Sequence, residues 1–376
     1  MTTPPRTPAR IPGIDVLRGL SVLLVVTHHY NLRVPIAKAP VAQHLPAALS
    51  RLIGWTGYYG VIVFFTISGF LITSLSLARW GSLAQVRPKA FYLMRATRIL
   101  PCLLALLAIL AALHLLNVHD YRIDTARISL PRALVAALTF HVNWLEGHHG
   151  YLPGNWDVLW SLSVEEAFYL AFPLVCVAVP SRKLLVLVLL ALIAVGPLSR
   201  TWIDLDIWDD YAWLSCMDGI AFGVLAALFA AEVTLGRAAQ WASVALGLAA
   251  MVLVLWFRKE TQALGLTTFN LQVSVLELGT ALTLIAAAQL PSQTWFLKLT
   301  GPLRALGRAS YEIYLTHMFV VFSAVRLAPA DFKTSQWVPL GYVAVVLASA
   351  ALGLLVARVY SERLNRTLRQ RYLGGA

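Results

Sequence analysis

Long apolar stretches recur along this chain from residue 16 to residue 357, with only short gaps between them. Hydrophobic residues make up 59% of the sequence and charged residues only 13%, whereas a soluble domain carries about 25% charged residues. A stretch of about 20 mostly apolar residues is long enough to cross a bilayer as a helix. Because such a span must satisfy its own backbone hydrogen bonds, we expect an all-α polytopic membrane protein.

Eleven apolar stretches are candidates for membrane-spanning helices. They lie near residues 15–33, 57–78, 98–117, 131–145, 157–179, 183–199, 212–231, 239–257, 271–290, 308–327 and 337–358. The stretch 131–145 is the weakest, because it has only fifteen residues and is interrupted by His141 and Asn143. Without it ten spans remain. We predict that 131–145 lies at the outer surface or re-enters the membrane.

The distribution of basic residues supports an even number of spans. Arg6 and Arg10 precede the first span, and four arginines follow the last one, so both termini are expected in the cytoplasm. With ten spans, the cytoplasmic segments hold nineteen Lys and Arg and the outer segments eleven. We therefore predict a membrane domain over residues 1–360 and a basic cytoplasmic tail over 361–376. The acidic loop with Asp204, Asp206, Asp209 and Asp210 would lie outside.

The net charge of +12 does not indicate a nucleic-acid-binding protein. Most Lys and Arg lie just beyond the ends of apolar segments, as the positive-inside rule requires, rather than on one face of a soluble module. His141, His148 and His149 lie near one another, but their spacing is not that of a metal site. We expect the protein to contact the lipid bilayer and to bind neither nucleic acid nor metal.

Ionisable residues within spans are costly and often functional. On the first predicted helix, Arg18 and His29 are eleven residues apart and share one face, separated by about 16 Å along the axis. Arg18 would lie near the cytoplasmic boundary and His29 near the middle of the membrane. The spacing alone leaves two interpretations open: an interfacial Arg with a structural His, or a functional pair.

Three further groups of polar residues allow a structural and a functional interpretation. Arg95 and Arg98 are either cytoplasmic anchors or a phosphate clamp, since guanidinium groups bind phosphate bidentately. Glu165 and Glu166 are adjacent acids about two turns inside the outer end of their span, and Ser161 shares a face with Glu165. Tyr314 and His317 are three residues apart, either hydrogen-bonded for structure or part of a site.

Gly69, on the second span, is expected at a close helix contact.

Five segments in order resemble the acyltransferase-3 family of bacterial membrane O-acyltransferases. They are RGLSVLLVVTHH with Arg18 and His29, FFTISGFLIT, FYLMRATRILP with Arg95 and Arg98, WSLSVEEAFYL with Glu165 and Glu166, and SYEIYLTH with His317. Three positions depart from the family pattern: Ala167 replaces a usual Gln, Thr316 a common Trp, and Glu312 a small polar residue. The form expected is the stand-alone one, with no SGNH-type domain after the last span.

The resemblance implies transfer of an acyl group, most often acetyl, from cytoplasmic acyl-CoA to a hydroxyl group of a glycan or lipid-linked saccharide such as exopolysaccharide or O-antigen. It places the protein in the bacterial inner membrane. His29, Arg18, Glu165 and Glu166 would be catalytic, Arg95 and Arg98 would bind the acetyl-CoA donor, and Ser161, Tyr314 and His317 would bind substrate. The alternatives are a glycan transporter or flippase without chemistry and a polyprenyl-linked glycosyltransferase.

Overall fold

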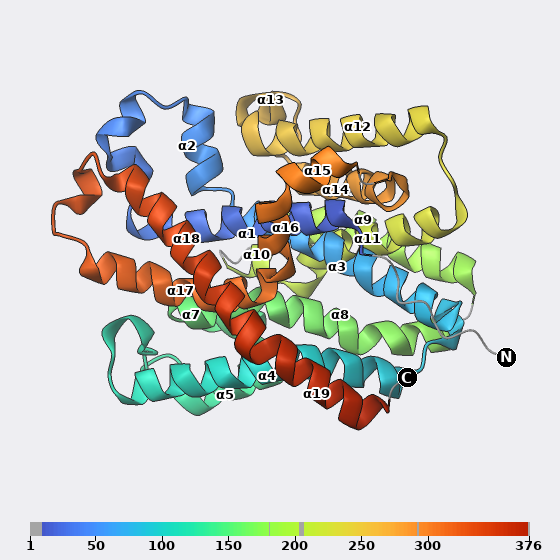
Figure 1. Ribbon diagram of the computed structural model, residues 1–376, viewed down its shortest axis with the longest axis horizontal. Helices are drawn as coiled ribbons and strands as arrows, with labels where there is room; N and C mark the ends of the chain where they lie inside the picture. Colours follow the sequence, from blue (N-terminus) through green and yellow to red (C-terminus); the bar gives the residue numbers. More distant parts are fainter. Residues whose placement is uncertain (1–9, 180, 203–206, 292, 375–376) are drawn as a thin grey trace.

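The computed structural model describes residues 10–179, 181–202, 207–291 and 293–374, and within these ranges the chain forms helices and no β-strand. Figure 1 shows the longer helices packed side by side, as in a bundle that spans a membrane. The predicted all-α, polytopic fold is confirmed. Arg6, Asp204 and Asp206, which entered the charge argument, lie outside the described residues.

Ten long helices correspond to the ten predicted spans. They are α1 (Pro12–Arg33), α3 (Gly57–Trp80), α4 (Pro88–Leu115), α8 (Leu159–Ala178), α9 (Arg182–Trp202), α11 (Trp213–Glu232), α12 (Arg237–Trp256), α14 (Leu271–Gln289), α17 (Ser310–Leu327) and α18 (Val338–Val356). Eight helical segments in the described ranges are long and apolar enough to cross a membrane, and they account for all of these helices except α1 and α17. These two helices carry many of the ionisable residues singled out in the sequence.

The segment 131–145 does not form one spanning helix. It is divided between α5 (Leu130–Leu138) and α6 (Val142–His149), with Phe140 at a φ of 56° between them. At 1.5 Å per residue, helices of nine and eight residues rise only about 14 and 12 Å. Neither crosses a hydrocarbon core of about 30 Å, which agrees with a surface or re-entrant position.

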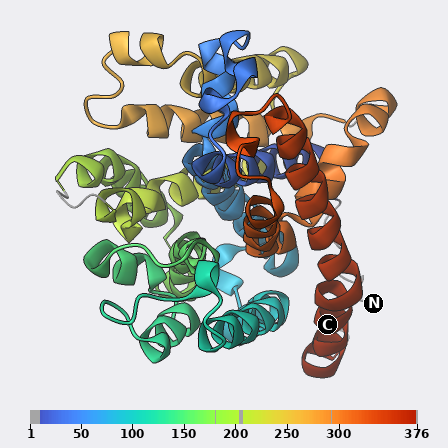
Figure 2. The ribbon, with the colours of Figure 1, turned by 90° about the vertical axis from the view of Figure 1, so that its left-hand side faces the viewer.

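Shorter helices connect or extend the long ones. They are α2 (Ala47–Gly54), α7 (Gly154–Asp157), α10 (Trp208–Tyr211), α13 (Arg258–Ala263), α15 (Thr294–Leu299), α16 (Gly301–Arg308) and α19 (Glu362–Leu373). A π-helical turn, Ala357–Ser361, joins α18 to α19. Figure 2 shows these last elements as one long rod at the edge of the molecule.

Glycine permits a close contact between α3 and α11. A Cβ atom at Gly69 of α3 would overlap the carbonyl group of Ile220, and one at Gly223 of α11 would overlap the carbonyl group of Thr66. The close helix contact expected at Gly69 is confirmed. Backbones that approach this closely gain van der Waals contact in lipid, where the hydrophobic effect does not hold helices together.

A buried ion pair joins α9 to α11 away from the residues singled out in the sequence. Arg200 Nη2 lies 2.7 Å from Asp218 Oδ2, and the two side chains are 1% and 0% exposed. Arg200 Nη2 also donates to Ser274 Oγ of α14 at 3.3 Å. Because a charge in the membrane interior needs a partner, this pair fixes the relative position of three helices.

Candidate functional site

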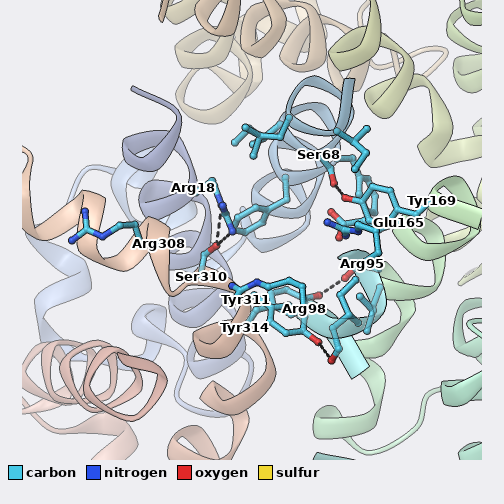
Figure 3. Close-up of a pocket in the computed structure, with 18 of the residues that line it drawn as sticks. Arg18, Ser68, Arg95, Arg98, Glu165, Tyr169, Arg308, Ser310, Tyr311 and Tyr314 are labelled. Carbon is cyan, nitrogen blue, oxygen red and sulfur yellow. Dashed lines mark hydrogen bonds between the residues drawn. The ribbon is translucent and has the colours of Figure 1, made fainter. Parts of the chain in front are cut away.

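A cavity of about 440 Å³ lies among α1, α3, α4, α8, α17 and α19. Its polar lining comes from helices far apart in the sequence: Arg10, Arg18, Ser68, Arg95, Arg98, Ser161, Glu165, Tyr169, Arg308, Ser310, Tyr311, Tyr314, Glu362, Asn365 and Arg369. Figure 3 shows most of these side chains converging on one space, with Arg308 set apart from the others. Of the nine predicted site residues, six line this cavity: Arg18, Arg95, Arg98, Ser161, Glu165 and Tyr314.

Arg18 reaches the cavity wall from the second turn of α1. Its Nε and Nη2 atoms lie 3.2 and 2.9 Å from Ser310 Oγ, at the start of α17. Asp15, one turn earlier, pairs instead with Arg10 at 3.4 Å. The guanidinium group of Arg18 therefore has a hydroxyl partner and keeps its positive charge available to the cavity.

Arg95 is held between an acid and an aromatic ring. Its Nη2 atom lies 3.4 Å from Glu166 Oε1, and its Cζ atom lies 3.6 Å from the centre of the Tyr169 ring. The hydroxyl group of Tyr169 in turn makes a hydrogen bond with Ser68. This arrangement fixes the orientation of Arg95 and partly neutralises it.

Arg98 is paired with Glu312 on α17. Its Nη1 atom lies 2.9 Å from Glu312 Oε1, and the Glu312 side chain is fully buried. Ser361 donates to the same carboxylate oxygen at 2.6 Å. Glu312, one of the departures from the family pattern, thus connects α4, α17 and the turn before α19.

The side chains of the adjacent acids Glu165 and Glu166 point in different directions, because neighbouring residues are about 100° apart around a helix. Glu165 lines the cavity, whereas Glu166 is buried behind it against Arg95. Glu165 is the acid in a position to contact a bound molecule, and Glu166 positions a cation.

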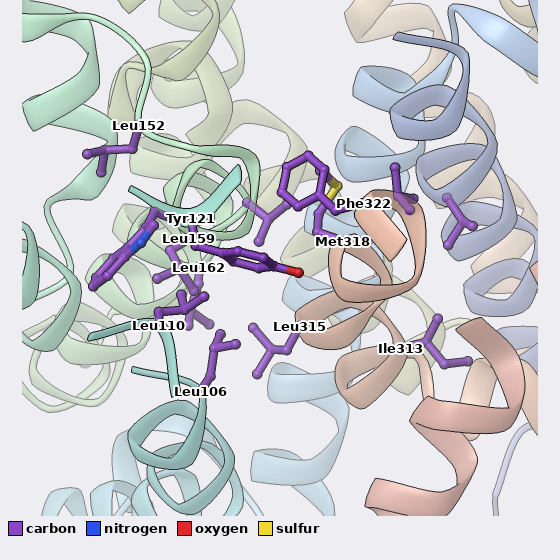
Figure 4. Packing of buried hydrophobic residues seen from close by; sticks show 14 of the residues in the cluster. Leu106, Leu110, Tyr121, Leu152, Leu159, Leu162, Ile313, Leu315, Met318 and Phe322 are labelled. Carbon is purple, nitrogen blue, oxygen red and sulfur yellow. The ribbon is translucent and has the colours of Figure 1, made fainter. Parts of the chain in front are cut away.

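Ser161 and Tyr314 close one end of the cavity. Ser161 Oγ lies 2.7 Å from Tyr314 Oη, which also donates to the carbonyl oxygen of Val158 at 3.0 Å. Leu162 and Leu315 continue the lining at this end. Figure 4 shows both within a packed apolar cluster with Leu106, Leu110, Leu159 and Met318, all buried.

His29 and His317 form a pair next to this closed end, outside the cavity lining. The rings of Tyr314 and His317 are 5.9 Å apart, and those of His29 and His317 are 4.9 Å apart. His317 Nδ1 lies 2.7 Å from the carbonyl oxygen of Tyr314, and His317 Nε2 lies 3.1 Å from His29 Nδ1. The structure thus brings together the two histidines that the sequence placed 288 residues apart.

These contacts assign the tautomers of two neutral rings. A carbonyl oxygen only accepts, so His317 carries its proton on Nδ1 and its Nε2 accepts. His29 must then donate from Nδ1, which also lies 3.0 Å from the carbonyl oxygen of Val25. The lone pair of His29 is therefore on Nε2. That atom has no hydrogen-bonding partner among the described residues.

The cavity is strongly positive. Within the part of the chain that the structure describes, six arginines and two glutamates line it. Positive charge concentrated between low-dielectric walls attracts an anionic ligand. Three of the arginines come from the margins of the site: Arg10 precedes α1, Arg308 is the last residue of α16, and Arg369 lies on α19.

The sequence reasoning missed several lining residues. Ser68, Tyr169, Ser310 and Tyr311 all lie within segments quoted for the family resemblance, but neutral polar side chains on a helix gave no separate signal. Arg308 stands at the start of the predicted span 308–327 and was not singled out, and the α19 residues were assigned to a tail. Only the folded arrangement places them on the cavity.

A cap of short helices covers the N-terminal end of α8. Glu146 of α6 is fully buried and accepts from the backbone N–H of Leu152 at 2.9 Å. Burial, and secondarily the neighbouring Asp157 carboxyl group, raises the pKa of Glu146 well above its usual value. Tyr211 donates to Asp157 at 3.2 Å and stacks on Trp160 at 4.0 Å. The cap is therefore a packed layer rather than a loose loop.

Comparison with known proteins identifies one family. The family model described as "Acyltransferase domain" (Acyl_transf_3) matches residues 11–358. A putative O-acetyltransferase of Staphylococcus aureus (strain COL) is 31% identical over 175 residues, which are 44% of this chain and 25% of that protein. The O-acetyltransferase OatA of the same strain is 26% identical over 345 residues, 84% of this chain and 51% of that protein. This chain thus aligns with about a quarter to a half of the length of these curated relatives. No solved structure matches.

Proposed function

We propose, since this chain belongs to the acyltransferase-3 family, that it is a membrane O-acetyltransferase. The proposed reaction moves an acetyl group from cytoplasmic acetyl-CoA to a hydroxyl group of a cell-surface or exported glycan, such as exopolysaccharide or O-antigen, in the bacterial inner membrane. The relatives named as O-acetyltransferases support the reaction class. The donor and the acceptor are our proposal.

The observation that carries this proposal is the His29–His317 pair beside the closed end of a basic cavity. His317 accepts from His29 Nδ1 and thereby leaves the lone pair of His29 on Nε2. A histidine whose tautomer is fixed by a neighbour, with its other nitrogen unpartnered, has the arrangement of a general base.

The proposed reaction follows from these positions. His29 Nε2 takes the proton of the acceptor hydroxyl group as its oxygen attacks the thioester carbonyl carbon. The C–O bond forms, the C–S bond breaks, and the proton passes from His29 to the CoA thiolate, so no net proton is released. Ser161 donates to Tyr314 and would turn its hydroxyl proton toward the thioester oxygen when the donor binds. Arg18, Arg95 and Arg98 attract the anionic donor, and Glu165 orients the substrates.

His29 and its neighbour His28 provide a matched test. A general base contributes about 10²–10⁴-fold to the rate, so His29→Ala should abolish acetylation while the protein remains in the membrane. His28 has a different partner, the carbonyl oxygen of Gly54 at 2.8 Å, and His28→Ala should retain most activity. Both variants would be returned to a strain lacking the gene, and O-acetyl groups on its surface glycans measured by NMR.

Full O-acetylation with His29→Ala would contradict the assigned base. Unchanged O-acetylation in the strain lacking the gene, together with loss of exported glycan, would instead support the transporter alternative. Release of free thiol from acetyl-CoA by membranes that contain the protein separates the two classes, because a flippase does not cleave the thioester.

A further inference from the structure

The last helix, α19, contributes to the cavity although it lies beyond the family match. That match ends at residue 358, and α19 runs from Glu362 to Leu373. Glu362, Asn365 and Arg369 line the cavity. Their spacing of three and four residues places them on one face of the helix. A segment that the sequence treats as a tail thus forms part of the cavity wall.

The turn before α19 is hydrogen-bonded to two neighbouring helices, α17 and α4. Two side chains of this π-helical turn, Ala357–Ser361, donate hydrogen bonds to other elements. Ser361 donates to the buried Glu312 at 2.6 Å, and Tyr360 donates to the carbonyl oxygen of Pro101 in α4 at 3.1 Å. Single π turns within helices often occur at functional sites. Figure 1 shows α19 continuing from α18 beside α4.

Arg369 carries a charge that no acid balances. Among the described residues it has no carboxylate within 4.0 Å, whereas Arg95 and Arg98 each have one. Its electrostatic neighbours are Arg79, Arg95 and Arg98, all cations. Asn365, one turn away on the same face, has a side-chain oxygen that is buried and makes no hydrogen bond. Since Arg95 and Arg98 already have carboxylate partners, Arg369 is the cation of this group that a bound anion can stabilise.

Arg369 is an exposed residue of the cavity lining, whereas Ser161 is buried. It is seven residues beyond Glu362 on α19, about 10 Å further along the axis, and its side chain is exposed. The closed end, near Ser161 and Tyr314, is where the proposed reaction places the thioester. The opposite end of a CoA molecule, the 3′-phosphorylated adenosine, would therefore lie near Arg369.

We infer that α19 is part of the donor site and that Arg369 binds the 3′-phosphate group of the acyl-CoA donor. This inference rests on the proposed function, because it takes acyl-CoA as the ligand. Arginine suits the role, since its planar guanidinium group pairs bidentately with phosphate. An anionic lipid headgroup offers the same phosphate chemistry.

The test measures binding of CoA, 3′-dephospho-CoA and pantetheine to the purified full-length protein in neutral detergent, by isothermal titration calorimetry. Loss of one charge-assisted phosphate contact weakens binding by about tenfold or more. Arg369→Gln should therefore weaken CoA binding by this factor and leave binding of 3′-dephospho-CoA and pantetheine unchanged. Arg363→Gln, on the same helix but not on the cavity lining, is the matched control and should bind all three ligands as the unmodified protein does.

Unchanged CoA affinity in Arg369→Gln would overturn the inference and leave the proposed function standing. An equal loss for CoA and pantetheine would also overturn it, because pantetheine has no phosphate and such a loss means a distorted cavity. If the unmodified protein binds neither CoA nor acetyl-CoA, the proposed donor fails and the inference fails with it.

A second measurement separates the two sources of phosphate. The protein and the Arg369→Gln variant would be placed in nanodiscs of phosphatidylcholine, with and without phosphatidylglycerol, and bound lipid counted by native mass spectrometry. We expect equal retention of phosphatidylglycerol by the two proteins. Reduced retention by the variant with unchanged CoA affinity would assign Arg369 to lipid and overturn the inference.

Discussion

At the scale of single residues, the site depends on which atom of each histidine holds a proton. His317 is fully buried and its Nδ1 proton is committed to the carbonyl oxygen of Tyr314. That commitment makes His317 Nε2 an acceptor for His29. His317 is therefore a positioning residue for the proposed base, with no role that requires it to touch a substrate.

We predict that His317→Leu lowers kcat for acetyl transfer by about 10–100-fold, because loss of the partner leaves the His29 ring free to adopt the wrong tautomer or orientation. The KM for acetyl-CoA should change little. His317→Gln, whose amide both accepts and donates, should restore part of kcat. Steady-state kinetics of the two variants gives the measurement, and equal losses for Leu and Gln, or a rise in KM alone, would contradict the positioning role.

Sequence reasoning found the charged residues of the site better than the neutral ones. An Arg or Glu in an apolar stretch is conspicuous because its burial is costly, so Arg18, Arg95 and Glu165 stood out. Ser68 and Tyr169 did not, since helices in lipid carry many such side chains. The meeting of His29 and His317 depends on how two helices pack, and spacing within either helix does not contain that information.

At the scale of helices, apolar length predicted the spans well. The ten long helices follow the predicted segments, and the short, interrupted stretch 131–145 divides into α5 and α6. Pairwise packing was harder to foresee. The contact of α3 with α11 depends on Gly69 and Gly223 each facing a backbone carbonyl group, and only one of these glycines was singled out from the sequence.

We predict that Gly223→Ala destabilises the protein by about 1–3 kcal/mol, the usual cost of forcing atoms into a packed interior. The new Cβ would overlap the carbonyl group of Thr66 and lie 2.7 Å from the backbone nitrogen of Phe70. Gly236→Ala is the control, since nothing lies within 4 Å of a Cβ at that position. Thermal unfolding in detergent should show a lower Tm for Gly223→Ala only; equal Tm values would mean that α3 and α11 separate at little cost.

At the scale of the whole molecule, positive charge gathers where α1 begins and α19 runs. Arg10 and Arg369 line the same cavity from opposite ends of the chain, so the two ends of the described chain lie on one side of the bundle. The positive-inside rule predicts that this side faces the cytoplasm, where the proposed acyl-CoA donor would be available.

We predict that a green fluorescent protein fused after residue 376 fluoresces, and that alkaline phosphatase fused there is inactive, because the positive-inside rule predicts a cytoplasmic C-terminus. Fusions within the loop that follows α4 should give the opposite result, since seven crossings, an odd number, separate the two positions in the ten-span arrangement. An active phosphatase at the C-terminus would reverse the orientation and place the cavity mouth away from the donor.

The hydrogen bond between Ser161 and Tyr314 also bears on electrical insulation. A wide, water-accessible cavity lined by arginines thins the low-dielectric barrier that maintains the membrane potential. Beyond the hydroxyl pair, a cluster of buried apolar residues extends to α5 and α6, and such packing leaves no room for a chain of water molecules. A ligand held in this cavity would therefore lie deep in the bilayer without opening a path for protons, and the membrane would keep its proton-motive force.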